Sequence, residues 1–479
     1  MSLLNNAKWN FFSQAFKILA QLINVVYLAK IIPPAEYGIM AMAMVVINLG
    51  TLLRDLGTSA AIIQRKELTS NLVNTVFWLN VIMGVGLCII VLGSSSFIAS
   101  LYHQDKLFYV LVILSVVFPL SSCAAAHLAL LERESQFKKI SIIEVSSSTV
   151  SVIVAIVLAN LGFGVYSLVF QAIVLNLMSA IQFWVASSWR PSFKTIINGD
   201  ELKKIFSFSA NLSLFNFINY FSRNTDSFMI GKFMNATILG SYNLAYRIML
   251  FPLQSLTFVA ARSLYPILSK SQDDNLQISK IYINCVFFIL LITAPLMSGL
   301  AFYSKPFVSI VFGEQWHITG DILKWLAPTA IIQSVLSTSG SVFMAKGRTD
   351  VLLKLGIIGA FLQVSSFLIG VHYDISTFAM CYMIANILNF FPVMYLLMKI
   401  INDTLFSLVK AIFPIFIAVA VMIFLLSMVH SHYPLGNIDS AFLLIMFSLL
   451  GAVFYFFAIL TFSAYFRGMF LARMKRKTV

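Results

Sequence analysis

Residues 71–93 read NLVNTVFWLNVIMGVGLCIIVLG, a long run of mainly apolar residues that contains no charged side chain. A helix needs roughly 20 predominantly apolar residues to cross the hydrocarbon core of a bilayer. Because this run meets that requirement, it predicts a transmembrane helix. The rest of the chain can be compared with it.

Apolar runs of similar length recur along all 479 residues. The chain is 60% hydrophobic and only 10% charged, and its mean hydropathy is +0.91, whereas an ordinary soluble domain is about 25% charged. We therefore expect an all-α integral membrane protein of about fourteen transmembrane helices, with no large soluble domain. The predicted spans are 10–31, 37–61, 71–93, 107–131, 140–160, 164–187, 205–230, 237–261, 281–303, 320–344, 351–371, 375–398, 408–430 and 439–465.

The net charge of +14 has an explanation in membrane topology. Cytoplasmic loops of membrane proteins are enriched in Lys and Arg, so we expect no nucleic-acid partner. With the N-terminus inside, the opposite loops hold little beyond Lys30, Lys106, Lys232 and Lys305. The asymmetry predicts that both termini are cytoplasmic. The basic residues then placed inside are Arg65, Lys66, Arg133, Lys138, Lys139, Arg190, Lys194, Lys203, Lys204 and the tail from Arg467 to Lys477.

Two halves of the chain look related. AEYGIMAMA at 35–43 lies 202 positions before TILGSYNLA at 237–245, and SWRPSFKTIINGDELKK at 188–204 interrupts the apolar pattern between them. Transporters commonly place their substrate at the interface of such repeats. The predicted organisation is an N-terminal six-helix lobe at 1–187, a cytoplasmic linker at 188–204, a C-terminal six-helix lobe at 205–400, two further helices at 401–466 and a basic cytoplasmic tail at 467–479.

A few ionisable side chains fall inside predicted spans. Burying such groups in a bilayer is costly, so they usually face a protein interior or a wet cavity. Polar residues also recur every three or four positions in these spans, which places them on one helix face. We expect the stripes to converge on a positively biased central cavity. The candidate substrate-binding residues are Lys17 in the first span, Arg54 and Asp55 in the second, Arg223 and Asp226 in the seventh, and Arg247 in the eighth.

Structural alternatives remain open for several of these residues. Lys17 could extend to the headgroups from the inner part of its span, and Arg54 with Asp55 could form a structural ion pair. Arg223 and Asp226, three residues apart, could neutralise each other. Arg247 has no acidic residue three or four positions away, so it is the strongest candidate.

Signatures of catalysis are absent from the sequence. The chain contains no Walker A motif, no H-E-x-x-H and no G-x-S-x-G, and its four cysteines and six histidines show no metal-ligand spacing. We expect neither a catalytic nor a metal site. A polytopic membrane enzyme remains an alternative, although it would require larger outer loops than the spans leave.

Several motifs together resemble a known family. PAEYG at 34–38, RDLGTSAAIIQ at 54–64, RESQFKK at 133–139 and GFGVYSL at 162–168 are similar to those of Wzx-type polysaccharide transporters, which belong to the multidrug, oligosaccharidyl-lipid and polysaccharide exporter superfamily. The resemblance covers essentially the whole chain. It implies two six-helix lobes followed by two more helices in a bacterial inner membrane.

The resemblance also implies a function. Such proteins carry an oligosaccharide on undecaprenyl diphosphate from the cytoplasmic to the periplasmic leaflet by alternating access, for the synthesis of O-antigen, capsule or exopolysaccharide. Cationic residues on helices 1, 2, 7 and 8 line the family's cavity, and the matching positions here are those of the six candidates. The Arg–Asp pair on helix 1 of the related lipid II flippase is missing, so the role of Lys17 does not follow from it.

The mechanism follows from the chemistry of the lipid-linked headgroup. The planar guanidinium of Arg can donate two parallel hydrogen bonds to one phosphate, which favours Arg54, Arg223 and Arg247 as headgroup contacts. We expect no cofactor, and expect coupling to H⁺, Na⁺ or the membrane potential. Expected partners are the lipid-linked oligosaccharide, membrane lipids, and the polymerase and chain-length machinery. A cation-coupled multidrug antiporter of the same superfamily is the main alternative.

Overall fold

The computed structural model describes residues 20–55, 62, 68–193, 196–199, 220–221, 224–432 and 441–468, with the backbone alone for residue 55 and for 252–263. The first part of the first predicted span and most of the seventh lie outside these residues. The chain forms two compact units, Met1–Gly240 and Ser241–Val479. Each unit is described by itself.

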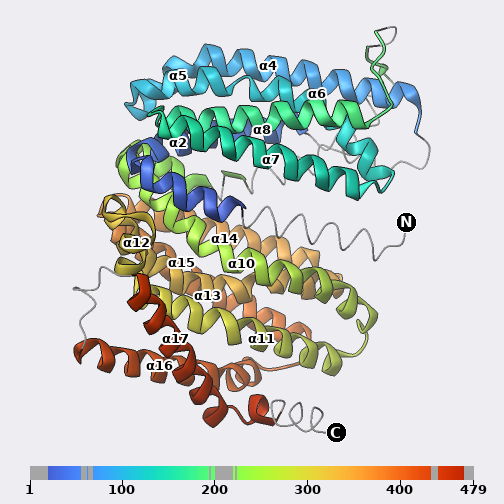
Figure 1. Ribbon diagram of the computed structural model, residues 1–479. Helices are drawn as coiled ribbons and strands as arrows, with labels where there is room; N and C mark the ends of the chain where they lie inside the picture. Colours follow the sequence, from blue (N-terminus) through green and yellow to red (C-terminus); the bar gives the residue numbers. More distant parts are fainter. Residues whose placement is uncertain are drawn as a thin grey trace. The chain divides into compact units, whose positions relative to one another are not determined.

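The first unit is a bundle of long helices (Figure 1). In the bundle, α7 packs on the next helix, α8, and α4 and α8 both pack on α6. A break at Ser115 and Val116 divides the predicted span 107–131 into two helices. Pro119 accounts for it, because a proline ring clashes with the carbonyl four residues earlier, which is that of Ser115. The helices are Ala20–Ile31, α2 (Pro34–Asp55), α4 (Ser70–Tyr102), α5 (Asp105–Leu114), α6 (Val117–Arg133), α7 (Phe137–Asn160) and α8 (Val165–Ala186).

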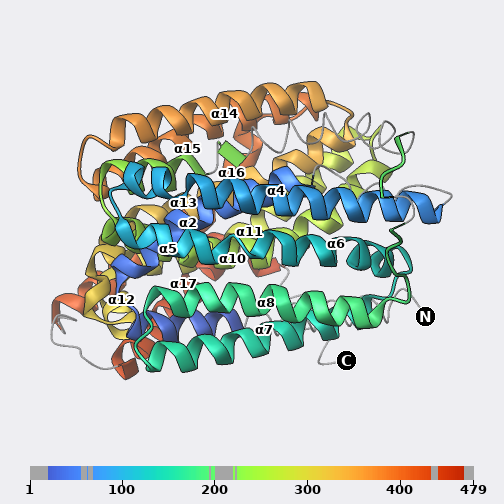
Figure 2. The same ribbon diagram turned by 90° about the horizontal axis from the view of Figure 1, so that it is seen from above.

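The second unit is also helical, and the packing of α11 on α13 and of α14 on α15 organises it (Figure 2). Its first helix, α10, begins a few residues before the boundary between the units. The elements are α10 (Ala236–Lys270), α11 (Asn275–Phe302), α12 (Ser304–Phe312), the 3₁₀ turn η1 (Glu314–Trp316), α13 (His317–Ala345), α14 (Thr349–Gly370), α15 (Ile375–Ile400), α16 (Leu405–His432) and α17 (Ala441–Phe462).

The predicted class, an all-α integral membrane protein, is confirmed. Among the described residues, 10 helical segments are long and apolar enough to cross a membrane, and α10 and α13 also coincide with predicted spans. Sequence periodicity therefore located most helices to within a few residues. The exact number of fourteen spans and the boundaries of the six-helix lobes stay predictions.

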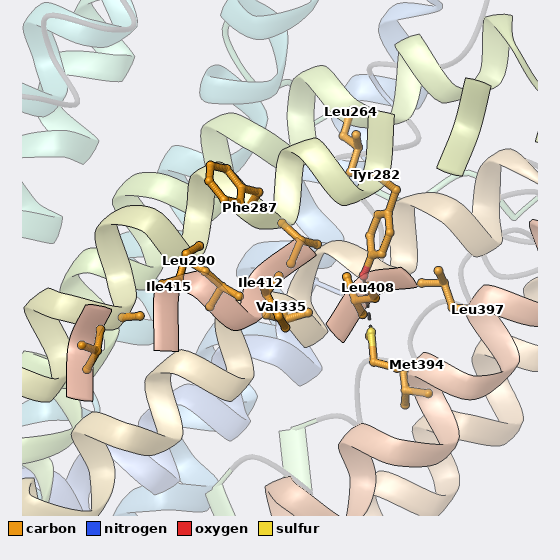
Figure 3. Packing of buried hydrophobic residues seen from close by; sticks show 14 of the residues in the cluster. Leu264, Tyr282, Phe287, Leu290, Val335, Met394, Leu397, Leu408, Ile412 and Ile415 are labelled. Carbon is orange, nitrogen blue, oxygen red and sulfur yellow. Dashed lines mark hydrogen bonds between the residues drawn. The ribbon is translucent and has the colours of Figure 1, made fainter. Parts of the chain in front are cut away.

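One face of helix α16 packs against the interior of the second unit. Its residues Leu408, Ile412 and Ile415 lie in one buried cluster with Phe287 and Leu290 of α11 (Figure 3). Helices in lipid associate mainly through van der Waals packing, since the surrounding acyl chains are equally apolar. Close side-chain contact of this kind therefore attaches α16 to the bundle.

A carboxylate at the start of α16 strengthens this attachment. Asp403 accepts hydrogen bonds from the hydroxyls of Ser279 and Ser407 and from the amide of Thr404, the last at 2.6 Å. Burial works to raise the pKa of Asp403, but these hydrogen bonds outweigh it and hold the pKa below its ordinary value. Because Ser279 lies on α11, the carboxylate links two helices that are distant in sequence.

Residues that are 202 positions apart in the sequence contact each other in the first unit. A Cβ added to Gly38 would lie 2.5 Å from the carbonyl carbon of Ala236, and one added to Gly240 would lie 2.9 Å from that of Pro34. The repeat offset of 202 converts Pro34 into Ala236 and Gly38 into Gly240. The first turns of α2 and α10 therefore meet through two symmetrically related glycine contacts.

The described part of the predicted linker is hydrogen-bonded to helix α4. The side-chain Nδ2 of Asn74 donates to the backbone carbonyl of Ser192 at 3.0 Å, and the side-chain Oδ1 of Asn74 accepts from the backbone N–H of Ser192 at 2.7 Å. The indole of Trp78 donates to the same carbonyl at 3.0 Å, and the amide of Asn198 donates to Thr75. The segment after α8 is thus fastened to the start of α4.

Candidate functional site: charged residues within the membrane spans

Three of the six candidate residues have described side chains. Arg54 and Asp226 belong to the first unit and Arg247 to the second. Lys17 and Arg223 lie outside the described residues, and Asp55 ends α2 with only its backbone described. The convergence of all six residues on one cavity stays a prediction.

Arg54 is positioned by a close approach of α2 to α6. A Cβ at Gly50 would lie 2.5 Å from the ring of Phe118, so the absence of a side chain at Gly50 lets that ring pack against the helix. One turn further along each helix, the guanidinium of Arg54 donates to the hydroxyl of Ser121. The half-buried Arg54 is therefore held within the first unit by Ser121. A planar guanidinium has five N–H donors, which suits it to bind a phosphate in addition to a hydroxyl.

Asp226 is a buried acidic residue of the first unit. It is buried, with 4% of its surface exposed, and accepts a hydrogen bond from the amide of Ser227 at 2.6 Å. A few residues earlier, the Tyr220 hydroxyl donates to the carbonyl of Val45 on α2.

Arg247 lies on the exposed face of α10, one turn after the half-buried Asn243. Tyr242, Ala245 and Met249 occupy the opposite, buried face. Asn243 and Arg247 therefore lie on one side of this helix, away from its buried face. The role of Arg247 in substrate binding stays a prediction.

Asn24 adds an unsatisfied acceptor to the polar stripe predicted for the first span. Only 8% of its surface is exposed, and its side-chain oxygen has no hydrogen-bond partner among the described residues. Buried polar atoms are nearly always hydrogen-bonded, so an exception invites a functional explanation. A ligand hydroxyl or a cation could supply the missing partner.

Sequence reasoning missed a polar cluster inside the second unit. The amide of Gln333 on α13 donates to the hydroxyl of Tyr382 at 2.7 Å and to the side-chain oxygen of Asn386 at 3.2 Å, both on α15. Asn389 follows on the same face, and its buried side-chain oxygen has no hydrogen-bond partner in the part of the chain that the structure describes. The spacing of Tyr382, Asn386 and Asn389 by four and three residues was a visible signal.

Sequence reasoning also missed the setting of His127, which lies fully buried in α6. Its ring centroid is 4.8 Å from that of Trp184 and 5.5 Å from that of Trp189, and Phe77 also packs against it. Neither ring nitrogen has a hydrogen-bond partner within the described part of the chain. Within the same part, no group of three His, Cys, Asp or Glu side chains could hold a metal ion.

Many apolar helices of spanning length, with a small number of charged side chains placed within them, define a polytopic membrane transporter. The family of polysaccharide biosynthesis proteins matches residues 27–321, and the chain belongs to that family. The resemblance to polysaccharide transporters is thereby confirmed.

Individual relatives cover most of the chain. The teichuronic acid biosynthesis protein TuaB of Bacillus subtilis (strain 168) is 28% identical over 88% of this chain and 87% of its own length. The lipopolysaccharide biosynthesis protein WzxC of Escherichia coli (strain K12) is 29% identical over 77% of this chain and 75% of its own. The fold is similar to that of the lipid II flippase MurJ in an inward closed conformation, with a TM-score of 0.76 at 16% identity over 96% of this chain and 99% of that one.

Proposed function

We propose that this protein is a flippase that carries an oligosaccharide linked to undecaprenyl diphosphate from the cytoplasmic to the periplasmic leaflet, for the synthesis of a surface polysaccharide. The observation that carries the proposal is the placement of Arg54 at the end of a helix apolar enough to cross a membrane, and of Arg247 within the long helix α10, in a chain from the polysaccharide biosynthesis family. Relatives that cover most of the chain bear names of teichuronic acid and lipopolysaccharide biosynthesis.

The charges suit the substrate. Sugars and a diphosphate cannot cross hydrocarbon unaided, whereas the polyprenyl tail can remain in lipid, so the carrier must shield only the headgroup. Arg247, exposed on α10, is the primary phosphate contact in this proposal, and Arg54 is the secondary one. Sugar contacts fall to neutral polar groups such as Asn24.

Transport is coupled to the membrane in this proposal. The buried Asp226 binds the coupling cation or keeps the empty cavity from excessive positive charge. The membrane potential adds about 2.3 kcal/mol per charge for each 100 mV, which favours outward movement of an anionic headgroup. In this proposal the protein resides in the bacterial inner membrane with both termini in the cytoplasm. It delivers the flipped oligosaccharide to the polymerase and the chain-length machinery.

The experiment is leaflet transfer of a fluorescent undecaprenyl diphosphate oligosaccharide in liposomes that contain the purified protein. Arg247→Ala removes both charge and hydrogen bonds, and Arg247→Lys keeps the charge but loses the planar fork. Arg467→Ala serves as a control, because Arg467 is an exposed arginine beyond the last spanning helix.

We expect rapid transfer with the wild type and the control, a loss of at least tenfold with Arg247→Ala, and an intermediate rate with Arg247→Lys. Equal rates for all four proteins would move the headgroup site away from Arg247. No transfer by the wild type, combined with proton-driven or sodium-driven efflux of cationic drugs, would replace the flippase with the antiporter.

A further inference from the structure

A groove lies on the outer surface of the first unit, between the beginning of α7 and the end of α8. It has a volume of about 280 Å³, and its walls include Lys139, Ile142, Ile143, Ile181, Gln182 and Val185. Ile142 is 50% exposed, Ile181 48% and Val185 78%. These branched aliphatic side chains therefore face the surroundings of the protein and not its core.

The polar side chain in the wall of this groove is already satisfied. The Gln182 side-chain oxygen accepts a hydrogen bond from Ser146 at 2.7 Å, and its amide nitrogen donates to Ser147 at 3.2 Å. Both serines lie on α7, so these bonds join the two helices. With these groups engaged within the protein, the walls of the groove offer hydrocarbon contact, which suits an acyl chain better than a sugar.

The mouth of the groove is positively charged. Lys138 and Lys139 are exposed in the first turn of α7, a turn that contains no acidic residue and receives no side-chain cap. Cations are unfavourable at a helix N-terminus, where the macrodipole is already positive. An anion beside Lys139 would offset the charge of Lys139 and the partial positive charge of the helix N-terminus. The aliphatic walls of the groove lie next to Lys139.

We propose that this groove is a binding site for an anionic phospholipid of the cytoplasmic leaflet, with the phosphate at Lys139 and one acyl chain along Ile142, Ile181 and Val185. In the topology proposed above, the beginning of α7 lies at the cytoplasmic surface. The lining of α8 from Ile181 to Ala186 extends about 7 Å, roughly half of the ~15 Å depth of one leaflet. This length accommodates the upper part of a single acyl chain and is short for a polyprenyl tail.

The test uses native mass spectrometry of the purified protein with phosphatidylglycerol or phosphatidylcholine, together with a phosphatidylglycerol that carries a photoreactive group in one acyl chain. Lys139→Gln removes the charge, and Lys410→Gln is its control, because Lys410 is also exposed near the start of a spanning helix. Ile142→Trp fills the groove. Ile153→Trp is its matched control, since Ile153 is 55% exposed on the same face of α7 about 16 Å away.

We expect phosphatidylglycerol to bind more tightly than phosphatidylcholine, and Lys139→Gln to weaken its binding about fivefold, the usual effect of one Lys beside an anionic headgroup. The photoreactive chain should label 181–186, and Ile142→Trp should abolish the labelling while both control variants retain it. Equal binding of the two lipids, or labelling unaffected by either groove variant, would overturn the proposal. Displacement of the label by undecaprenyl diphosphate at lower concentrations than by phosphatidylglycerol would overturn the assigned occupant.

Because binding is measured without transport, the result is independent of the flippase assay. Lipid bound at the groove by a protein that fails to flip would leave this proposal standing and reject the proposed function. Normal flipping by Ile142→Trp together with lost lipid labelling would support both.

Discussion

The paired glycine contact between α2 and α10 gives the sharpest prediction for stability. Gly38→Ala adds a Cβ that would lie 2.5 Å from the carbonyl carbon and 2.8 Å from the Cα of Ala236. Ordinary contact begins near 3.4 Å, so the two helix starts must separate by about 1 Å or more. The obstructing atoms belong to the backbone and cannot rotate away.

The cost of this separation sets the size of the effect. Forcing an extra methyl group into a closely packed contact costs about 1–3 kcal/mol. Gly240→Ala meets the backbone of Pro34 in the equivalent geometry, so its effect should be similar. The two effects should not add, because the separation imposed by the first Cβ makes room for the second.

The assay is reversible unfolding of the purified protein in mixed micelles, with Gly38→Ala, Gly240→Ala and the double variant. Gly93→Ala is the matched control: Gly93 also lies in a helix, but its added Cβ meets nothing within 4 Å. The control should be stabilised by about 0.5–1 kcal/mol, because alanine loses less conformational entropy than glycine. The single variants should therefore change stability in the direction opposite to the control.

Two results would refute this reasoning. The first is stabilisation by Gly38→Ala or Gly240→Ala to the same extent as by Gly93→Ala, which would mean that the helices do not touch there. The second is a double variant whose loss equals the sum of the single losses, which would mean that the two contacts are independent.

Two further predictions concern the hydrogen bonds of Asp403 and Asn74, which attach other segments to the helices. Asp403→Ala should lower the free energy of unfolding by about 1–3 kcal/mol, because it leaves Ser279 without its acceptor. The pKa of Asp403 is lower in the folded state than in the unfolded state. The stabilisation by Asp403 is therefore fully present above the unfolded-state pKa and is lost as the pH falls through the folded-state pKa. In acid the wild type should become no more stable than the variant, and a stability difference that persists there would contradict this account. Asn74→Ala should release the segment that contains Ser192, so trypsin should cleave after Lys194 several-fold faster than in the wild type, and unchanged cleavage would show that the other contacts suffice.

The sequence determined the class of the protein because the bilayer imposes a simple rule. A membrane span must satisfy its own backbone hydrogen bonds and present apolar side chains to lipid, so runs such as 71–93 reveal helices directly, and α4 begins at Ser70 as the pattern predicts. The sequence also indicated an offset of 202 residues, and Gly38 and Gly240, which this offset relates, lie in contact in the structure; the repeat of whole lobes stays a prediction.

The positions of individual charges could be predicted only in part. The four-residue spacing of Asn243 and Arg247 shows that they share one side of a helix, but not what they contact there. Sequence spacing could not show that Arg54 bonds Ser121, a residue 67 positions away, because that partnership depends on how closely α2 approaches α6.

Tertiary structure alone decided which polar groups are satisfied and where the surface is hollowed. Gln182 looks like any polar residue in a span until Ser146 and Ser147 are seen to engage both ends of its amide, which leaves an aliphatic groove beside Lys139. Composition and periodicity are local properties that the chain carries in one dimension. Contacts between helices depend on the register and distance at which separate segments pack, and only the folded molecule defines those.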